Sequence, residues 1–366
     1  MSSQSGGVRS QRTDRPLCVA LTRAGSELGS VLARALTAAG DQVVGLDDRS
    51  GTTPEVLWRL TDLTSPRLVD AVRDVDAIVH LTPGVDLSSD LTEDPDARRN
   101  RATRELQTLT VSAAAAGVPH LVVVTSAMVY GARADNPVPL PEDSPLRSAD
   151  AEGLVADLVD LEDLLDRARQ VHPGLRVTSV RPAALVGPGV DSIITRHFEA
   201  PRLLTLRGAE PRWQFCHVAD LGRALALVVH RRLGPVVAVG APGSLSQEEV
   251  EAVSGMRHIA ISASAAHGAA DRLHRLGVLP LPATDLAYVS DPWVVEPSLL
   301  RANGWVPDHD NASALRVLLE AVRGRHALMA RRVERKDAAL GAAGAASAAV
   351  ALIATAALLR RRRRRP

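Results

Sequence analysis

The sequence predicts an α/β fold, a doubly wound parallel sheet with helices on both faces, and three observations support this prediction. From Leu17 onward, short β-like runs such as LCVALT alternate with longer helical runs such as SELGSVLARALTAAG, which is the rhythm of a parallel α/β sheet. The strand runs are nearly continuous apolar stretches, as expected when helices cover both sheet faces. With 366 residues, the chain is long enough to bury a large core.

The elements follow in chain order. Strands are expected at residues 17–22, 41–47, 56–63, 77–82, 120–126 and 175–182, and helices at 26–40, 65–74, 96–116 and 151–170. After Arg181, clusters of Pro and Gly interrupt this rhythm, which indicates a smaller second lobe that is partly interleaved with the first. The expected organisation is a polar tail at 1–16, the sheet domain at 17–182 with 215–240 contributing, and the smaller lobe at 183–312.

The C-terminal residues differ in composition from the rest of the chain. A basic helix is expected at 313–337 with Ser313 as its N-cap, followed by 22 uncharged residues at 338–359 and an Arg-rich tail at 360–366. As a helix, the uncharged stretch would be about 33 Å long, enough to span a bilayer. We expect it to be a transmembrane or membrane-associated helix, with a soluble Ala-rich helix docked on protein as the alternative. Arginines on both sides leave its orientation open.

The overall composition excludes several classes of function. Forty-three basic residues balance 42 acidic ones, and aromatic residues make up 2%, so neither charge nor stacking surfaces indicate nucleic-acid binding. Cys18 and Cys216 lie in apolar runs without metal-ligand spacing, and no metal site is expected. The first sixteen residues lack the apolar stretch of a secretory signal, so a cytoplasmic domain is predicted.

Residues 19–32, VALTRAGSELGSVL, combine a strand, a small-residue loop and a helix, as dinucleotide-binding turns do. The stretch resembles the extended short-chain dehydrogenase/reductase superfamily, in particular its NAD-dependent epimerase/dehydratase family, whose Rossmann-type turn reads TGxxGxxG. Thr22 falls on the family's threonine, and Arg23, Ser26 and Gly29 fall on its three glycines. Gly25 is expected to offer a permissive turn, Ser26 to bond phosphate, and Arg23 to pair with the pyrophosphate or fill its space.

The resemblance assigns a cofactor site to Thr22, Arg23, Gly25, Ser26, Leu28, Gly29, Asp47, Asp62, Leu63, His80, Leu81, Thr82 and Asn100. In the family, the acid at the position of Asp47 accepts a hydrogen bond from the adenosine ribose. Because Asp48 lies beside it, a 2′-phosphate would be repelled, so NAD is favoured over NADP. Surface acids and core residues remain the alternative interpretation of each position.

Four further stretches carry the resemblance across about 290 residues: VVVTSAMVYG at 122–131, RPAALVGPG at 181–189, FCHVADLGRAL at 215–225 and NGWVP at 303–307. Within this family, the pattern resembles an atypical actinobacterial branch that lacks the YxxxK dyad. The resemblance implies a nucleotide-sugar substrate, with Arg181, Arg207 and Arg212 meeting its phosphates, although surface arginines are common in this chain. It also implies a possible homodimer.

The chain lacks the catalytic dyad of this superfamily. There, a YxxxK pair on a helix places a phenol and an ammonium on one face, and a Ser or Thr orients the substrate. Ser126 falls on that serine, but Leu154 and Leu158 fall on the Tyr and Lys. No YxxxK exists anywhere, since Lys336 is the only lysine. Other proton-transfer candidates are weaker: Tyr130 as a substitute acid, and Asp157, Asp160, His80 and His217, which are more simply interpreted as structural.

Two hypotheses follow from this pattern. In the first, the protein is an NAD-dependent epimerase, dehydratase or reductase that acts on a nucleotide sugar through Ser126 and an unorthodox acid or base. In the second, it is a pseudoenzyme, a nucleotide-binding or scaffold module associated with the membrane. Loss of both dyad members favours impaired catalysis, because such groups supply orders of magnitude in rate. A reductase that does not need Tyr is a third interpretation.

Overall fold

A seven-stranded sheet forms the centre of the computed structural model, which describes residues 15–84, 87–148, 150–200, 202–276 and 281–323 and the short segments 327–328 and 331–332. Its strands are β1 (Cys18–Thr22), β2 (Gln42–Asp47), β3 (Val56–Leu60), β4 (Ala77–Leu81), β5 (His120–Val124), β6 (Arg176–Pro182) and β11 (Val236–Val239). All neighbours are parallel, in the order β11-β6-β5-β4-β1-β2-β3. The predicted α/β fold with a parallel sheet is confirmed.

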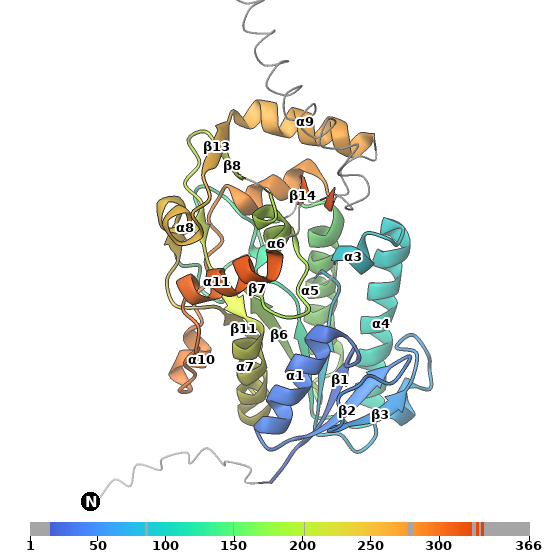
Figure 1. Cartoon of the computed structure of the whole chain (residues 1–366). Coiled ribbons are helices and arrows are strands. Elements are labelled where there is room, and N and C mark those ends of the chain that lie inside the picture. Colours follow the sequence, from blue (N-terminus) through green and yellow to red (C-terminus); the bar gives the residue numbers. More distant parts are fainter. Residues whose placement is uncertain are drawn as a thin grey trace, which may run out of the picture.

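Helices cover both faces of this sheet (Figure 1). On one face, α1 (Glu27–Ala38) packs against α7 (Val218–Arg231); on the other, α4 (Pro95–Ala115) packs against α2 (Leu68–Ala71) and α5 (Gly153–Val171). Alternate strand residues belong to the two cores: Val19 and Leu21 face the α1 side, whereas Ala20 faces the α4 side. Both faces are buried, which explains the nearly continuous apolar runs of the sequence.

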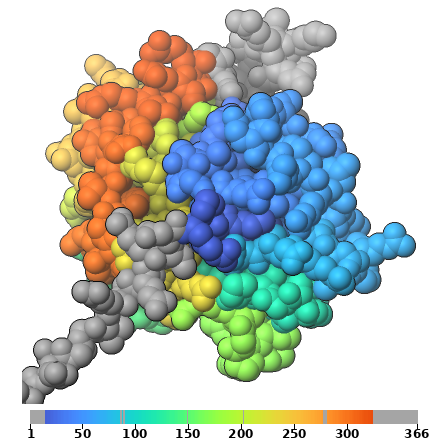
Figure 2. Space-filling model, turned by 90° about the horizontal axis from the view of Figure 1, so that it is seen from below, coloured from blue at the N-terminus to red at the C-terminus, as the bar shows by residue number. Residues whose placement is uncertain are grey.

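Shorter elements build the rest of the molecule. They are α3 (Leu87–Asp90), η1 (Ala127–Tyr130), β7 (Ala184–Val186), α6 (Ile193–Phe198), β8 (Leu203–Leu206), β9 (Arg212–Trp213), β10 (Phe215–His217), β12 (Leu245–Ser246), α8 (Gln247–Ser254), β13 (His258–Ile261), α9 (Ala263–Arg275), η2 (Ala283–Val289), α10 (Ser298–Ala302), α11 (Asn311–Val322), β14 (Ala327–Leu328) and β15 (Arg331–Arg332). Seen from below, the N-terminal residues (blue) and the residues near 300 (orange) form opposite flanks (Figure 2).

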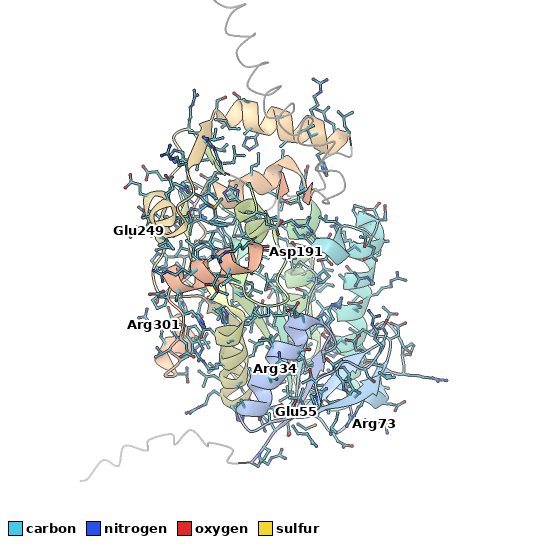
Figure 3. The ribbon with its side chains drawn as sticks, in the orientation of Figure 1. Arg34, Glu55, Arg73, Asp191, Glu249 and Arg301 are labelled. Carbon is cyan, nitrogen blue, oxygen red and sulfur yellow. The ribbon has the colours of Figure 1, made fainter. Side chains whose placement is uncertain are left out.

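Asp191 ties the segment before α6 to the connection that follows β4. Its main-chain oxygen accepts a hydrogen bond from the Leu87 amide at 2.8 Å, and its buried carboxylate pairs with Arg196 at 2.8 Å. In Figure 3 Asp191 lies near the middle of the view, whereas Glu249 and Arg301 lie toward its left edge. Residues after Arg181 are therefore packed against the sheet domain rather than separated from it.

The last described helix differs from its predicted form. It begins at Asn311 and ends at Val322, and Asp310, not Ser313, is its N-cap, since the Asp310 carboxylate accepts the Ser313 amide at 2.7 Å. A continuous helix over 313–337 is therefore wrong, because β14 and β15 form an antiparallel pair inside that range. No helix in the described part of the chain has the length and apolar character needed to cross a membrane. Residues 338–359 lie outside the described residues, so membrane association stays a prediction.

Candidate functional site

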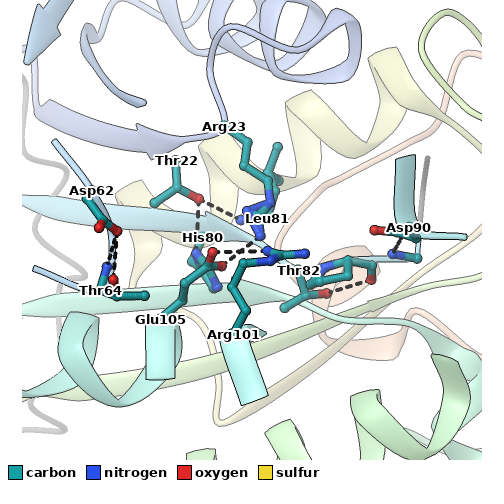
Figure 4. Close-up of polar contacts among 12 residues, drawn as sticks. Thr22, Arg23, Asp62, Thr64, His80, Leu81, Thr82, Asp90, Arg101 and Glu105 are labelled. Atoms are coloured by element: carbon teal, nitrogen blue, oxygen red, sulfur yellow. Dashed lines mark hydrogen bonds and ion pairs between the residues drawn. The ribbon is translucent and has the colours of Figure 1, made fainter. Parts of the chain in front are cut away.

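The strand order reverses at β1, whose two neighbours are β2 and β4. In open α/β sheets, ligands bind in the crevice outside the carboxyl ends of the strands at such a reversal. The turn after β1, residues 23–26, lies at this point and leads directly into α1. Figure 4 shows Thr22 and Arg23 at this turn and His80, Leu81 and Thr82 at the end of β4, all five of them predicted cofactor residues.

Backbone geometry in the turn differs from the expected one. The left-handed residue is Arg23, with a φ of 51°, and not Gly25. The Gly25 amide instead donates to the Asp47 carboxylate at 2.9 Å. The Ser26 hydroxyl donates to the Arg23 main-chain oxygen at 2.8 Å and accepts the Gly29 amide at 2.9 Å, so it caps α1. Ser26 is thus engaged within the turn.

Gly29 has the packing role that the family's third glycine has. A Cβ atom at Gly29 would lie 2.2 Å from the Arg23 main-chain oxygen and 2.8 Å from the Ala24 Cα, both backbone atoms that have little room to move. The start of α1 approaches the end of β1 closely only because this side chain is absent. Leu28, the preceding residue, points into the core and is 2% exposed.

At the end of β2, Asp47 accepts hydrogen bonds from the amides of Gly25 and Asp48, each at 2.9 Å. Burial nevertheless raises the pKa of Asp47 above its ordinary value. Asp62 is exposed, and hydrogen bonds from the Thr64 amide and hydroxyl lower its pKa. Leu63 packs in the core on the α4 side and offers no polar group. Of the two predicted cofactor carboxylates, Asp47 and Asp62, Asp47 is therefore the one that bonds the turn after β1.

The end of β4 is fixed by internal hydrogen bonds. The Thr22 hydroxyl lies 3.0 Å from His80 Nδ1 and accepts the Leu81 amide at 3.0 Å, and the Thr82 hydroxyl donates to the Val124 carbonyl at 2.7 Å. Burial and the nearby Arg23 charge lower the pKa of His80 to about 3, so this ring is neutral at physiological pH. These hydrogen bonds hold the carboxyl ends of β1 and β4 together. Asn100, by contrast, is exposed on α4.

A chain of ion pairs that the sequence did not predict lies at this edge of the sheet. Arg23 Nη2 lies 2.7 Å from Glu105 Oε2, Arg101 Nη1 lies 3.0 Å from Glu105 Oε1, and Arg101 Nη2 lies 2.7 Å from Glu93 Oε2. We call Arg23, Glu105, Arg101 and Glu93 the ion-pair chain (Figure 4). It joins the turn on the α1 side of the sheet to α4 on the other side.

Apolar packing occupies the two positions of the missing dyad. Leu154 and Leu158 are each 5% exposed. Leu154 packs with Leu87 and Leu281, and Leu158 belongs to the core on the α4 side. Within the same turn of α5, Asp157 forms a buried ion pair with Arg98 of α4 at 2.9 Å. Neither leucine can move a proton, and the charge of Asp157 is used in this pair.

Ser126 caps η1, and its oxygen accepts the Met128 amide at 3.2 Å. Tyr130 is directed elsewhere: its hydroxyl donates to the Glu142 carbonyl at 2.7 Å, and burial raises its pKa. The second tyrosine, Tyr288, comes from η2, and its hydroxyl donates to the Met128 carbonyl at 2.9 Å. Neither phenol is therefore free to replace the missing one beside Ser126.

Arg181, predicted to meet substrate, has a structural partner instead. Its Nε and Nη2 atoms donate to the two oxygens of Glu162 at 3.0 and 2.7 Å, and its guanidinium lies 4.8 Å from the centre of the Tyr130 ring. It is 6% exposed. Arg207, after β8, and Arg212, in β9, are exposed, so their guanidinium groups lie at the surface.

Among the described residues, one group has the spacing of a metal site: His217, Asp220 and His309. His217 Nδ1 accepts the Ala219 amide, which leaves the proton of the neutral ring on Nε2, and this histidine caps α7. The Asp220 carboxylate already accepts hydrogen bonds from the Asp308 and His309 amides and from His309 Nδ1. Asp220 and one ring nitrogen of each histidine are thus already used in hydrogen bonds within the protein.

Comparison with known proteins gives three similarities. A sequence model described as the NAD dependent epimerase/dehydratase family matches residues 25–240. An uncharacterized protein of Mycobacterium tuberculosis is 26% identical over 192 residues, which are 50% of this chain and 49% of that protein. A UDP-glucose 4-epimerase of Azospirillum brasilense is 32% identical over 171 residues, 44% of this chain and 47% of that enzyme. The chain spans about half the length of the curated relatives that it matches.

Solved structures share the fold. A structure described as MoeE5 in complex with UDP-glucose and NAD superposes with a TM-score of 0.59 at 23% identity, covering 83% of this chain and 98% of that one. A second, described as the NAD-dependent NDP-hexosamine 5,6-dehydratase TunA, has a TM-score of 0.62 at 22% identity and covers 84% of this chain and 98% of that one. At these identities the likeness shows the fold alone.

Proposed function

The chain belongs to the NAD dependent epimerase/dehydratase family, and from this premise we propose that it binds NAD but has lost the proton transfer of the YxxxK dyad. The binding site would be the crevice at the ends of β1, β2 and β4. NAD, when bound, supplies a hydride acceptor. The residues of this chain would hold the nucleotide, and no phenol or lysine would exchange a proton with a substrate hydroxyl beside Ser126.

The packing of Leu154 and Leu158 is the observation that carries this proposal. Both side chains are buried, and Leu154 contacts Leu87 and Leu281. The leucine side chains of this cluster carry no group that can donate or accept a proton. The helix α5 therefore keeps the shape of a catalytic helix while lacking its chemistry.

Binding is supported by features that remain at the turn. Gly29 allows the close approach of α1 to β1, and the N-terminus of the 12-residue helix α1 has a positive partial charge that favours phosphate. Asp47 lies at the end of β2, and its carboxylate can accept further hydrogen bonds, including those from a ribose. These features fit NAD better than NADP, because Asp47 and the adjacent Asp48 would repel a 2′-phosphate.

We propose a nucleotide sugar as the second ligand. Support comes from relatives that carry such compounds in their names: a UDP-glucose 4-epimerase and a structure in complex with UDP-glucose and NAD. The exposed residues Arg207 and Arg212, in the C-terminal part of the chain, would contribute positive charge toward the diphosphate of such a ligand. The alternative is a nucleotide-binding scaffold that takes no sugar at all.

Titration calorimetry of the full chain with NAD, NADH, NADP and NADPH tests the binding proposal. We expect NAD to bind more tightly than NADP, and Asp47→Ala to weaken NAD at least about tenfold through loss of the ribose hydrogen bonds. Asp48→Ala is the matched control. The Asp48 carboxylate is adjacent and exposed but is not proposed to bond the ribose, so this variant should change the affinity for NAD much less. Absence of binding at millimolar NAD would contradict the proposal.

A further inference from the structure

Arg23 occupies a position that is unfavourable for any residue other than glycine. Its φ of 51° lies in the left-handed region, which costs a side-chain-bearing residue more than it costs glycine. Ramachandran strain of this kind persists only where the surrounding structure compensates. At Arg23 the compensation is visible, because the side chain ends in a 2.7 Å ion pair with Glu105.

The side chain of Arg23 crosses the carboxyl edge of the sheet. The turn leads into α1 on one face, while Glu105 belongs to α4 on the other face. Between them lies the end of β4, where the charge of Arg23 contributes to lowering the pKa of His80. The Arg23 side chain is 26% exposed and the Glu105 side chain 9%. A diphosphate that entered this crevice would meet the guanidinium directly.

Main-chain donors of the turn are largely used up. The Gly25 amide donates to Asp47, the Ser26 amide to the Arg23 oxygen at 3.1 Å, and the Gly29 amide to the Ser26 hydroxyl. A diphosphate bound here would therefore depend on the amides at the start of α1, which have no intrahelical acceptor, and on the side chains of the turn. Arg23 is the cationic side chain of the turn, and a guanidinium can donate two parallel hydrogen bonds to a phosphate group.

Glu105 holds two arginines at once, which lowers the cost of releasing one. Arg101 Nη1 lies 3.0 Å from Glu105 Oε1, so this carboxylate keeps a partner when Arg23 leaves. Without Arg101, the same release would leave a buried carboxylate unpaired, which is strongly unfavourable. Arg101 is itself held by Glu93 at 2.7 Å, so it stays in place.

We propose that the Arg23–Glu105 ion pair is exchangeable and that the diphosphate of a bound nucleotide replaces Glu105 as the partner of Arg23. This inference rests on the proposed binding of a nucleotide in the crevice. Glu105 competes with the ligand for the Arg23 guanidinium. Arg101 lowers the free-energy cost of separating Arg23 from Glu105. The ion-pair chain then determines affinity for diphosphate-bearing ligands without contacting their bases or sugars.

The test is a set of variants of the full chain titrated by calorimetry with NAD and, separately, with inorganic pyrophosphate. Glu105→Gln removes the competitor and is expected to tighten both ligands about tenfold, whereas Arg23→Gln weakens both about tenfold. Arg101→Gln is expected to weaken the binding of both ligands several-fold, because the buried Glu105 carboxylate is left without a partner when Arg23 leaves it. The double variant Glu105→Gln, Arg101→Gln is expected to bind as tightly as Glu105→Gln alone, a non-additive result that a structural role would not give.

Other outcomes overturn the exchange. Tighter binding by Arg23→Gln would mean that Arg23 blocks the ligand. If Glu105→Gln binds like wild type, or if the effects of Glu105→Gln and Arg101→Gln add in the double variant, Glu105 does not compete with the ligand. If no variant binds NAD but pyrophosphate follows the expected pattern, the proposed function fails and the exchange stands. If NAD binds equally well to wild type and to all variants, NAD binding stands and the exchange of the ion pair fails. Should Glu105→Gln fail to fold, Arg23→Lys, which keeps the charge but not the paired donors, is expected to bind between wild type and Arg23→Gln.

Discussion

Replacing Asp285 with Asn is expected to raise the free energy of unfolding at pH 9 while leaving it nearly unchanged near pH 4. Asp285 is 4% exposed, and its Oδ2 atom is buried without a hydrogen-bond partner. Burial, reinforced by the charge of Glu152, raises the pKa of Asp285 to about 8. Its ionised form is therefore poorly tolerated inside the folded protein.

The sign of the effect follows from proton uptake. In the unfolded chain Asp285 loses its proton near its ordinary pKa of 3.8, whereas in the folded protein it keeps the proton up to about pH 8. Folding binds a proton between these values, so stability falls as pH rises through this window and stays low above it. The shift corresponds to a loss on the order of 5 kcal/mol, which the isosteric amide would avoid.

Urea unfolding at pH 4, 7 and 9 measures this effect. Asp291→Asn is the matched control from the same segment, because Asp291 is less buried and has a hydrogen bond from Ser290, and it should gain much less stability. Glu152→Gln should lower the pKa of Asp285, so the loss of stability should end at a lower pH and be smaller in total. An Asp285→Asn variant that tracks wild type at every pH would show that this carboxyl is not a buried acid.

Removing Glu162 is expected to be the most damaging single change in the sheet core. This carboxylate is 1% exposed and accepts hydrogen bonds from the hydroxyls of Thr125 and Ser179, each at 2.6 Å, and from Arg181 at 3.0 and 2.7 Å. Burial alone would raise the pKa of Glu162, but the hydrogen bonds and charge of Arg181 outweigh it and hold the pKa below its usual value. Glu162 is thus ionised and fully bonded.

Breaking this buried pair from either side leaves an uncompensated charge, so Glu162→Leu or Arg181→Met should each cost about 3–5 kcal/mol of unfolding free energy. The double variant should lose less than either single one, because no charge is stranded. Arg73→Gln is the exposed control: its ion pair with Asp70 lies at the surface and should be worth less than about 1 kcal/mol. Single variants that unfold like wild type would contradict this account.

Local sequence patterns predicted much of what the structure shows. The apolar runs placed six of the seven sheet strands within a few residues, whereas β11 was expected only as part of the contributing range 215–240. The family resemblance is confirmed by the match over residues 25–240. Gly29 kept its packing role, since close approach of two backbones demands the same residue wherever the turn occurs. The leucines at 154 and 158 were placed on α5, and both are buried there.

Tertiary partners could not be predicted in the same way. Arg23 pairs with Glu105, which is 82 residues away, and nothing local to either residue marks the pair. Arg181 was expected at the substrate, but Glu162 approaches it from α5 and binds it in the core. Ser313 and Asp310 are both good N-caps, and only the backbone decides between them. An unpaired buried acid such as Asp285 leaves no trace in the sequence, because burial is a property of the fold.

The most direct test of the central claim, binding without turnover, is a single-turnover experiment on the full chain. Protein saturated with NAD, as checked by calorimetry in the same buffer, is mixed in excess with UDP-glucose or UDP-galactose, and NADH absorbance and sugar composition are followed. We expect neither NADH nor any conversion of the sugar over hours, because Leu154 and Leu158 cannot transfer a proton. NADH or a new sugar that forms in wild type and disappears in Ser126→Ala would contradict it.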